Sequence, residues 1–427
     1  MDESLTKTRA TELVFRGGSL RLPGGRELSI GLSPLYVGRS PSCGVVLEDP
    51  EVSAMHCELL ADARGVRLRD LDSRNGTRLA GVRVESAWLT VACTIEVGSS
   101  RLEFVPGERE VVDLGGADTF GPLVGRSPEM RYVFRVLREV AGTDLAVLVR
   151  GETGTGKELV AQALHEASAR AKGPFVVVDC AAIPQTLAES TLFGHERGSF
   201  TSANERRDGA FQDAHGGTLF LDELAELPLD SQPKLLRALA ERKVKRVGGN
   251  YQPVDVRVVA AARRDFTTMV NDGRFRSDLF FRVAQVTITL PPLRDRLQDV
   301  PLLIAALCER MDAAERTASV VDAIARLLPG YDWPGNVREL ANVSSVLAKL
   351  PPDSSVAADV IGLGLGVESA SATSAYSEGK RQALAAFERR FFTDLRRICD
   401  GNITEIARRS GLSRQYVRAY LRKHGLS

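Results

Sequence analysis

The chain has 427 residues, 44% of them hydrophobic, which is too long for one core and predicts about three folded domains. Its 56 Lys and Arg residues balance 55 Asp and Glu residues, so the net charge is only +1. This balance excludes the whole molecule from the non-specific nucleic-acid binders and the membrane-surface proteins, so any basic surface must be local.

Cysteine usage and hydropathy indicate a protein of the cytoplasm. The six cysteines are scattered without a C-x-x-C pair, which argues against a disulfide scaffold and against a zinc site. The N-terminal residues lack a basic stretch followed by an apolar core, and nowhere do about 18 apolar residues run together as a membrane span requires. We therefore expect reduced structural thiols, a cytoplasmic location and no membrane partner.

The first predicted domain, residues 1–107, reads as all-β. Between about Glu12 and Val105, short alternating apolar segments are separated by Gly, Pro, Asn and Asp turn signals. This pattern is typical of a small sandwich. The polar, Gly-containing residues 108–121 then predict a linker.

Three motifs lie on loops between these short strands: Y-V-G-R-S with Arg39, S-A-M-H with Ser53, and N-G-T with Asn75. A phosphothreonine dianion is bound well by an arginine and several neutral donors that converge from loops of a rigid sandwich. Over nearly all of the first 105 residues the arrangement resembles the forkhead-associated (FHA) domain. The resemblance implies that these three residues bind phosphothreonine, on a partner protein or a Ser/Thr kinase.

Other interpretations of the same residues stay open. Asn75 and Gly76 form the commonest dipeptide of two-residue hairpin turns, and His56 is more typical of a hydrogen-bonded structural residue than of a ligand. Ala54 occupies a position that is often basic in FHA domains, so one phosphate contact is expected to be absent.

Residues 122–365 predict an α/β domain. The segments DLAVLVRG, PFVVVD, GTLFLDE and VDVRVVAA are compact apolar runs, as expected for parallel strands buried on both faces. From about Val300 to Leu350 the pattern becomes helical.

The strand LAVLVR runs into a glycine-rich segment and then a helix, which is the context of a phosphate-binding loop. The segment consists of Gly151, Glu152, Thr153, Gly154, Thr155, Gly156 and Lys157. Glycines let backbone N–H groups wrap the phosphates, and Lys157 can reach the outer phosphates as a point charge. Glu158 departs from the general pattern, because a Ser or Thr usually ligates magnesium there.

A second segment supports nucleotide hydrolysis. The apolar strand GTLFL ends in Asp222 and Glu223. One carboxylate can hold Mg²⁺ and the next can orient the attacking water. We therefore predict an ATPase that uses ATP and Mg²⁺, rather than a merely structural sheet.

About 240 residues closely resemble the AAA+ domain of sigma-54-dependent activators. The resemblance rests on GETGTGKELVA, CAAIP, ESTLFGHERGSFTSA, GGTLFLDEL, PKLLRAL, RVGG, GRFRSDLFFRV, PPLRDR and WPGNVREL. In this family the loop lysine is normally followed by Glu, so Glu158 is expected. The resemblance implies a helical lid from about residue 300 and places Lys157 on the phosphates, Asp222 on Mg²⁺ and Glu223 on the water.

The same resemblance implies contacts between subunits. Arg276 and Arg282 match arginine fingers that reach a neighbour's nucleotide and neutralise charge developing in phosphoryl transfer. Arg338, in WPGNVREL, matches the second sensor of the nucleotide site. Fingers acting on a neighbour require a homo-oligomer, from a dimer to a hexamer-like ring. For isolated arginines, surface ion pairs would be the ordinary alternative.

The loop that touches sigma-54 usually reads GAFTGA in this family and here reads GSFTSA. Gly198, Phe200 and Thr201 match, which implies the sigma-54 RNA polymerase holoenzyme as a partner. Ser202 stands in place of glycine and removes easy access to positive φ, so the loop tip is expected to be stiffer or redirected.

Two further positions depart from the family. Asp179 stands where an asparagine is thought to bond the catalytic glutamate, and a carboxylate cannot donate a hydrogen bond to Glu223 unless one of the two is protonated. Arg263 ends a first-sensor segment that usually reads AATN, so it either binds phosphate directly or faces solvent.

After a predicted linker at residues 366–379, residues 380–427 predict an all-α DNA-binding domain. Counted from Glu378, the end of the chain holds 12 Lys and Arg against 5 Asp and Glu, a net charge of +7. A short helix, a Ser-Gly-Leu turn and a second helix with Ser413 as N-cap predict a helix-turn-helix. The preceding segment ALAAFERRFFTDLRRICDG is expected to dimerise it.

The second helix has two predicted faces. Val417, Tyr420 and Leu421 are spaced to face the core, while the outer face is suited to phosphates or guanine edges of enhancer-like DNA. The predicted DNA contacts are Arg414, Gln415, Arg418 and Arg422. The segment resembles the Fis-type helix-turn-helix that ends the same activator family; a solvated charged helix face is the alternative.

The sequence therefore predicts a multidomain protein: an all-β FHA sandwich, an α/β P-loop AAA+ ATPase with a helical lid, and an all-α helix-turn-helix. The function it predicts is sigma-54-dependent transcription regulation, in which ATP hydrolysis by an oligomeric ring opens promoters under phosphothreonine control. The alternative is a DNA-binding, phosphothreonine-dependent AAA+ regulator, scaffold or repressor that does not remodel sigma-54.

Overall fold

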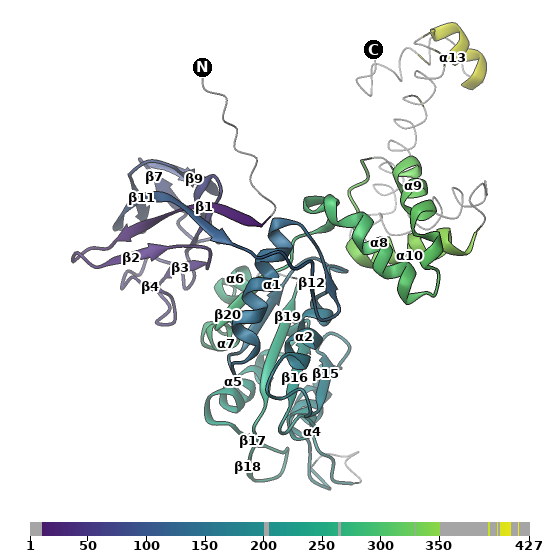
Figure 1. Cartoon of the computed structure of the whole chain (residues 1–427). Helices are drawn as coiled ribbons and strands as arrows, with labels where there is room; N and C mark the ends of the chain where they lie inside the picture. Colours follow the sequence, from purple (N-terminus) through teal and green to yellow (C-terminus); the bar gives the residue numbers. More distant parts are fainter. Residues whose placement is uncertain are drawn as a thin grey trace. The chain divides into compact units, whose positions relative to one another are not determined.

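The computed structural model of the chain describes residues 11–199, 205–263, 266–328, 330–350, 392, 399, 402–410 and 417 (Figure 1). They belong to two compact units, Met1–Ala348 and Lys349–Ser427. Among the helices that the structure describes, none combines the length and apolarity needed to cross a membrane.

The first unit begins with a β-sandwich of eleven hydrogen-bonded strands. Side chains alternate between core and surface: on one strand Leu102 and Phe104 are buried, and Glu103 between them is exposed, so this strand buries one of its faces. The strands are β1 Glu12–Arg21, β2 Glu27–Ile30, β3 Leu35–Gly38, β4 Val45–Val46, β5 Cys57–Asp62, β6 Gly65–Asp70, β7 Thr77–Leu79, β8 Val82–Val84, β9 Ser86–Leu89, β10 Cys93–Val97 and β11 Ser100–Asp113.

The end of the sandwich differs from the predicted boundary. Strand β11 pairs with β1 from Glu103 opposite Arg21 to Asp113 opposite Glu12. Residues 108–113, which the sequence predicts as linker, are therefore part of the sheet. The physical reason is that this polar segment gains backbone hydrogen bonds from β1, and Val112 packs against the edge of the core.

The ATPase domain has a five-stranded parallel sheet in the order β15-β16-β19-β14-β20. The four predicted strands are confirmed, and β20 is a fifth that the sequence reading missed. Parallel order brings the carboxyl ends of all strands to one edge, where ligands bind in such sheets. The strands are β14 Val147–Arg150, β15 Phe175–Asp179, β16 Thr218–Asp222, β19 Arg257–Ala262 and β20 Val286–Thr289.

Helices cover both faces of this sheet (Figure 1). Phe134 and Leu164 pack with Val149 in one core, and Leu192 and Phe280 pack in the other. The helices are α1 Pro128–Ala141, α2 Lys157–Glu166, α3 Ala188–Phe193, α4 Ala210–Asp213, α5 Gln232–Glu241, α6 Phe266–Asn271 and α7 Ser277–Val283. Two short hairpins complete the domain: β12 Thr119–Phe120 with β13 Leu123–Val124, and β17 Lys243–Lys245 with β18 Tyr251–Pro253.

The predicted helical segment follows the sheet. It contains α8 Val300–Arg310, α9 Thr317–Leu327 and α10 Asn336–Lys349. Trp333 and Asn336 both have positive φ at the entry to α10, so the chain turns sharply there.

One amide side chain joins the sandwich to the ATPase within the first unit. Asn271, at the end of α6, accepts from Met55 N at 3.1 Å and donates to Met55 O at 2.7 Å and Leu71 O at 2.8 Å. Asn271 therefore satisfies backbone groups of two sandwich loops at once.

The second unit contains helix α13, Ile403–Ser410, at the position predicted for the first helix of the helix-turn-helix. Phe392, Cys399, Ile406, Ala407 and Val417 form a buried cluster. Val417 is thus in a core, as predicted; Ser413, Tyr420, Leu421 and the four predicted DNA contacts lie outside the described residues.

Candidate nucleotide site

The phosphate-binding loop joins β14 to α2 at the carboxyl edge of the sheet. Its glycines adopt backbone conformations that side chains disfavour: φ is +79° at Gly154 and +105° at Gly156, the N-cap of α2. Lys157 is 8% exposed, and its Nζ donates to Gly151 O at 3.0 Å and Glu152 O at 3.3 Å. The lysine therefore folds over the loop in which phosphates would lie.

The two acidic residues lie near this lysine. Asp222 is the last residue of β16, and Glu223 follows it with a φ of +48°. Burial lowers the pKa of Lys157, and the carboxylates of Glu223 and Asp222 oppose that shift. The structure thus brings the predicted lysine and both predicted acids into one electrostatic cluster.

Asp222 is suited to Mg²⁺. Its Oδ1 accepts from Glu223 N at 3.0 Å, which leaves its other oxygen for a ligand. Within the described part of the chain, no group of three or more His, Cys, Asp or Glu side chains could hold a metal by itself. Magnesium commonly binds one or two carboxylates together with substrate phosphates, so this donor set fits.

Asp179 and Arg263 have different partners from those that the family pattern implies. Asp179 Oδ1 accepts from Ala181 N at 2.9 Å and Ala182 N at 3.3 Å, so this carboxylate caps its own turn. Arg263 N donates to Glu223 Oε2 at 3.4 Å, and Arg263 Nε lies 3.9 Å from the same oxygen. The sequence does not predict the pair of Arg263 and Glu223. The pair arises because β16 and β19 are neighbouring parallel strands whose carboxyl ends lie side by side.

Two residues, Arg294 and Asn336, join the lid to the phosphate-binding loop. Arg294 donates to both carboxylate oxygens of Glu152, at 2.6 and 2.9 Å. The buried Asn336 donates to Thr153 O at 3.0 Å and Glu152 Oε2 at 3.2 Å. Hydrogen bonds from Arg294 lower the pKa of the Glu152 carboxyl.

Arg338, the predicted second sensor, lies two residues after Asn336, in the first turn of α10. Its backbone N donates to Gly154 O at 3.2 Å, and its side chain is exposed. The loop and the start of α10 are therefore in direct contact.

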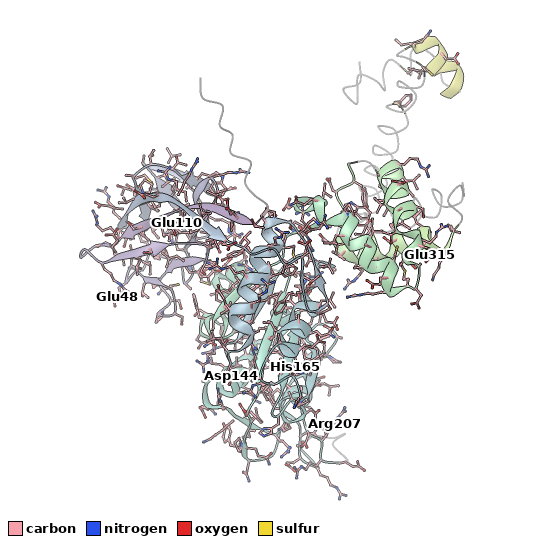
Figure 2. The ribbon with its side chains drawn as sticks, in the orientation of Figure 1. Glu48, Glu110, Asp144, His165, Arg207 and Glu315 are labelled. Atoms are coloured by element: carbon pink, nitrogen blue, oxygen red, sulfur yellow. The ribbon has the colours of Figure 1, made fainter. Side chains whose placement is uncertain are left out.

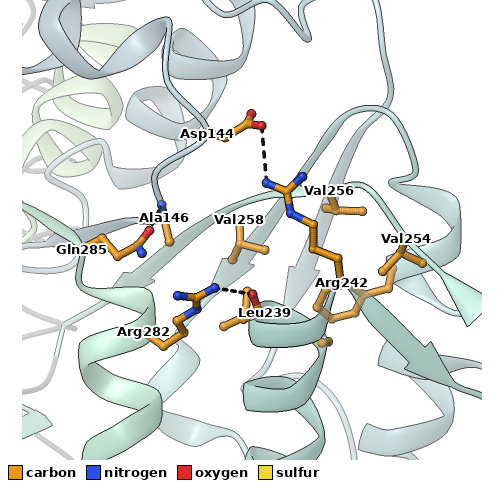
Figure 3. A pocket seen from close by; sticks show the side chains of 11 residues that line it. Asp144, Ala146, Leu239, Arg242, Val254, Val256, Val258, Arg282 and Gln285 are labelled. Atoms are coloured by element: carbon orange, nitrogen blue, oxygen red, sulfur yellow. Dashed lines mark hydrogen bonds and ion pairs between the residues drawn. The ribbon is translucent and has the colours of Figure 1, made fainter. Parts of the chain in front are cut away.

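Arg276 and Arg282 both bind groups of their own chain. Arg276 donates to the two carboxylate oxygens of Asp278 at 3.0 and 2.7 Å, which raises the pKa of Arg276. Arg282 Nη2 donates to Leu239 O at 2.8 Å beside a pocket that Asp144 also lines (Figure 3). Among the described contacts neither arginine touches the phosphate-binding loop, and the ion pair of Arg276 with Asp278 matches the alternative stated for isolated arginines.

Only the flanks of the predicted sigma-54 loop can be described. His195 and Arg207, the latter labelled in Figure 2, pair as an isolated antiparallel bridge across its base. Gly198 has a φ of +77°. Phe200, Thr201 and Ser202 lie outside the described residues.

The predicted phosphothreonine residues come from three neighbouring loops of the sandwich. Arg39 Nε donates to Val52 O at 3.2 Å, Asn75 Nδ2 donates to Glu51 O at 2.8 Å, and Ser53 Oγ accepts from Arg74 N at 3.0 Å. Arg39 and Asn75 are exposed. These hydrogen bonds hold the three loops together and leave cationic and amide donors at the surface.

His56 is structural, as the sequence indicates. It is fully buried, its Nδ1 accepts from Ser53 N at 3.2 Å, and burial lowers its pKa. A neutral imidazole therefore positions the backbone of Ser53.

Comparison with known proteins decides the family. Residues 123–289 match the family described as Sigma-54 interaction domain, and residues 294–376 match the AAA+ ATPase lid domain. The transcriptional regulatory protein ZraR of Klebsiella oxytoca is 43% identical over 310 residues, which cover 71% of this chain and 69% of ZraR. The chain belongs to the sigma-54-dependent transcriptional regulators.

Other members of the sigma-54 regulator family extend this match. The DNA-binding transcriptional regulator NtrC of Azospirillum brasilense is 49% identical over 251 residues, covering 58% of this chain and 52% of NtrC. The structure of NtrX from Brucella abortus in complex with ADP matches with a TM-score of 0.51 at 33% identity, over 71% of this chain and 70% of NtrX. The chain spans about half the length of several curated relatives, among them two NtrC proteins and a Nif-specific regulatory protein.

The sandwich of this sigma-54 regulator has its own matches. Residues 23–108 match the family described as Inner membrane component of T3SS, cytoplasmic domain. A solved phosphothreonine-dependent FHA domain is 27% identical over 21% of this chain and 95% of its own, with a TM-score of 0.20. The predicted order of a β-sandwich followed by a P-loop AAA+ domain with a lid is confirmed.

Proposed function

We propose that the chain is a cytoplasmic transcription activator whose subunits form a ring, hydrolyse ATP and thereby open promoters held by the sigma-54 RNA polymerase holoenzyme. The observation that carries this proposal is the meeting of Lys157, Asp222 and Glu223 at one sheet edge, inside a domain that matches the Sigma-54 interaction family.

The nucleotide chemistry follows from these side chains. Backbone N–H groups of Gly151–Gly156 and the Lys157 ammonium hold the phosphates of ATP. Asp222 would hold Mg²⁺, which neutralises charge on the phosphate oxygens. Glu223 orients water for attack on the γ-phosphorus, ADP departs, and phosphate is released. The helix N-terminus next to Glu158 and the exposed Arg338 on the lid complete the polar walls of the site.

Ring formation would give Arg276 and Arg282 their role. In a head-to-tail ring each subunit presents one surface to the nucleotide of its neighbour. Arg276 would exchange its surface ion pair with Asp278 for the phosphates of that neighbour. A pair of this kind, about half-exposed, is worth only about 0–1 kcal/mol, so the exchange costs little.

The remaining parts supply targeting and control. The loop that contains Gly198, Phe200 and Thr201 contacts sigma-54, and the basic C-terminal domain binds enhancer-like DNA. Arg39, Ser53 and Asn75 bind a phosphothreonine on a partner or on this protein, and this binding changes assembly or activity of the ring.

The decisive experiment measures promoter opening by sigma-54 polymerase with the purified full-length protein and ATP. We expect opening by the wild type, none by Glu223→Gln, and normal hydrolysis without opening by Phe200→Ala. A wild type that hydrolyses ATP but never opens the promoter would instead favour a DNA-binding, phosphothreonine-dependent regulator or scaffold. The serine at position 202 is the observation that makes this alternative worth testing.

A further inference from the structure

Arg263 pairs with the proposed catalytic glutamate, Glu223. It follows β19, which lies between β16 and β14 in the sheet, so the sheet order places it between Glu223 and the phosphate-binding loop. Its backbone N and its Nε face the same oxygen, Glu223 Oε2, at 3.4 and 3.9 Å. Arg263 also contributes positive charge at Lys157, so its field reaches the position of the phosphates.

Asp179, which ends the strand on the other side of β16, cannot donate a hydrogen bond to Glu223. Asp179 is paired in register with Asp222, and its Oδ1 already accepts two backbone hydrogen bonds from its own turn. An ionised carboxylate has no proton to donate and repels a second carboxylate. Burial and the negative charges of Asp179, Asp222 and Glu223 together raise the pKa of the nearby Cys180 to about 12, as expected beside several carboxylates.

We propose that Arg263 is the positioning residue for Glu223: its guanidinium holds the glutamate carboxylate until ATP is bound and then aims it at the attacking water. The proposal rests on the catalytic role proposed for Glu223. A guanidinium has five donors in a fixed plane, so it can bond Glu223 and a γ-phosphate oxygen together. Hydrolysis then adds water to the γ-phosphorus, breaks the bond to ADP, and directs the water proton toward Glu223.

Asp179 and Arg263, two positions that depart from the family pattern, thereby account for each other. An aspartate at position 179 would leave Glu223 without a donor, and an arginine at position 263 supplies one from the neighbouring strand. Arg263 is half-exposed, with 51% of its side chain accessible, so its guanidinium can rotate between Glu223 and a phosphate without disturbing the core.

The test measures kcat and KM for ATP on the full-length protein. Arg263→Ala is expected to lower kcat about tenfold or more while KM changes no more than about threefold, because the phosphate-binding loop and Lys157 still bind ATP whereas Glu223 loses its orientation. Arg274→Ala is the matched control, since this exposed arginine pairs only with Asp272 among the described contacts, and its kcat should equal that of the wild type.

Second-site rescue separates positioning from folding. Arg263→Asn should be impaired, and the double variant Asp179→Asn/Arg263→Asn should recover most of kcat because the new amide at position 179 can donate to Glu223. An unchanged kcat in Arg263→Ala, a rise in KM with kcat kept, or no rescue in the double variant would each overturn the proposal. Glu223→Gln is tested in parallel: if it hydrolyses ATP normally, the proposed role of Glu223 fails, whatever Arg263 does.

Discussion

Gly154 shows how strongly single residues constrain the nucleotide site. Its φ is +79°, and a Cβ built there would lie 2.2 Å from Gly335 O of the lid. A side chain would therefore be strained in the backbone and would also push the lid away from the loop. Glycine at this position serves two elements at once.

We expect Gly154→Ala to weaken ATP binding about tenfold or more, since positive φ and a backbone clash each cost about 1–3 kcal/mol. Isothermal titration with ATP measures the effect. Gly216→Ala is the matched control, because Gly216 has a φ of +78° but a Cβ at this position would meet no atom within 4 Å. Equal ATP affinity in the two variants would contradict a clash with the lid.

Arg39 carries the only full positive charge among the three predicted phosphothreonine contacts. Its side chain is exposed and donates to Val52 O, and its backbone N donates to Ser53 O at 2.9 Å. Charge-assisted hydrogen bonds to a phosphate are about twice as strong as neutral ones. Its removal should therefore weaken recognition of the phosphate more than it disturbs the fold.

The corresponding measurement uses a degenerate peptide library centred on phosphothreonine. Arg39→Ala should lower affinity for the phosphorylated library about ten- to hundredfold, from a loss of about 1.5–3 kcal/mol, whereas Arg26→Ala, on the exposed turn after β1, should bind as the wild type does. If wild-type protein binds phosphorylated and unphosphorylated libraries equally, the sandwich does not read phosphothreonine.

At the scale of elements, several hydrogen bonds join the phosphate-binding loop to the lid. Arg294 binds both oxygens of Glu152, and Asn336 joins Thr153 O to Leu293 N, which donates to Asn336 Oδ1 at 2.7 Å. Because these bonds join the loop to the beginning of α10, the lid can respond to a change in the loop.

Reversing one charge tests this link. Arg294→Glu should raise KM for ATP about fivefold and lower Tm slightly. The expected change in Tm is small because both partners are more than two-fifths exposed, so solvent screens the ion pair. Exchange of the two charges, Glu152→Arg/Arg294→Glu, should restore much of the loss. The measurement is KM for ATP in the wild type, in Arg294→Glu and in the double variant. If exchanging the two charges does not restore KM, residues 152 and 294 do not interact directly.

The sequence predicted elements better than it predicted their partners. Four of the five sheet strands and the phosphate-binding loop were evident, because buried parallel strands and a glycine-rich turn have local signals. The pairs of Arg263 with Glu223 and of Arg294 with Glu152 were missed, because each joins segments far apart in the chain. Strand β11 also extended past the predicted boundary, since pairing with β1 compensates for its polar composition.

At the scale of the first unit, Asn271 is the polar centre of the contact between sandwich and ATPase. Its three hydrogen bonds go to backbone groups of Met55 and Leu71, and Met55 is fully buried. Met55 is two residues from Ser53, a predicted phosphothreonine contact. The loops that would bind a phosphorylated ligand are thus the loops that the ATPase holds.

Asn271→Ala removes these bonds and leaves buried backbone groups without partners, at a cost of about 1–3 kcal/mol for each group. Differential scanning calorimetry of the full-length protein should show a lower Tm for the sandwich, separated from that of the ATPase. Asp272→Ala, an exposed neighbour paired with Arg274, should leave the scan unchanged. Superimposable scans of Asn271→Ala and wild type would contradict the structural role of this contact.

At the scale of the assembly, mixing inactive subunits tests whether a nucleotide site is shared. The Arg276→Ala subunit has an intact phosphate-binding loop but lacks a finger, and the Lys157→Ala subunit has intact fingers but lacks the loop lysine. Each variant should therefore be inactive alone. In equal mixtures about a quarter of head-to-tail interfaces unite an intact loop with an intact finger, and hydrolysis should return in proportion. Arg276→Ala mixed with Lys157→Ala/Arg276→Ala forms rings with no intact finger and should stay inactive. Hydrolysis that never returns at any mixing ratio would mean that Arg276 acts within its own subunit, where Asp278 already holds it.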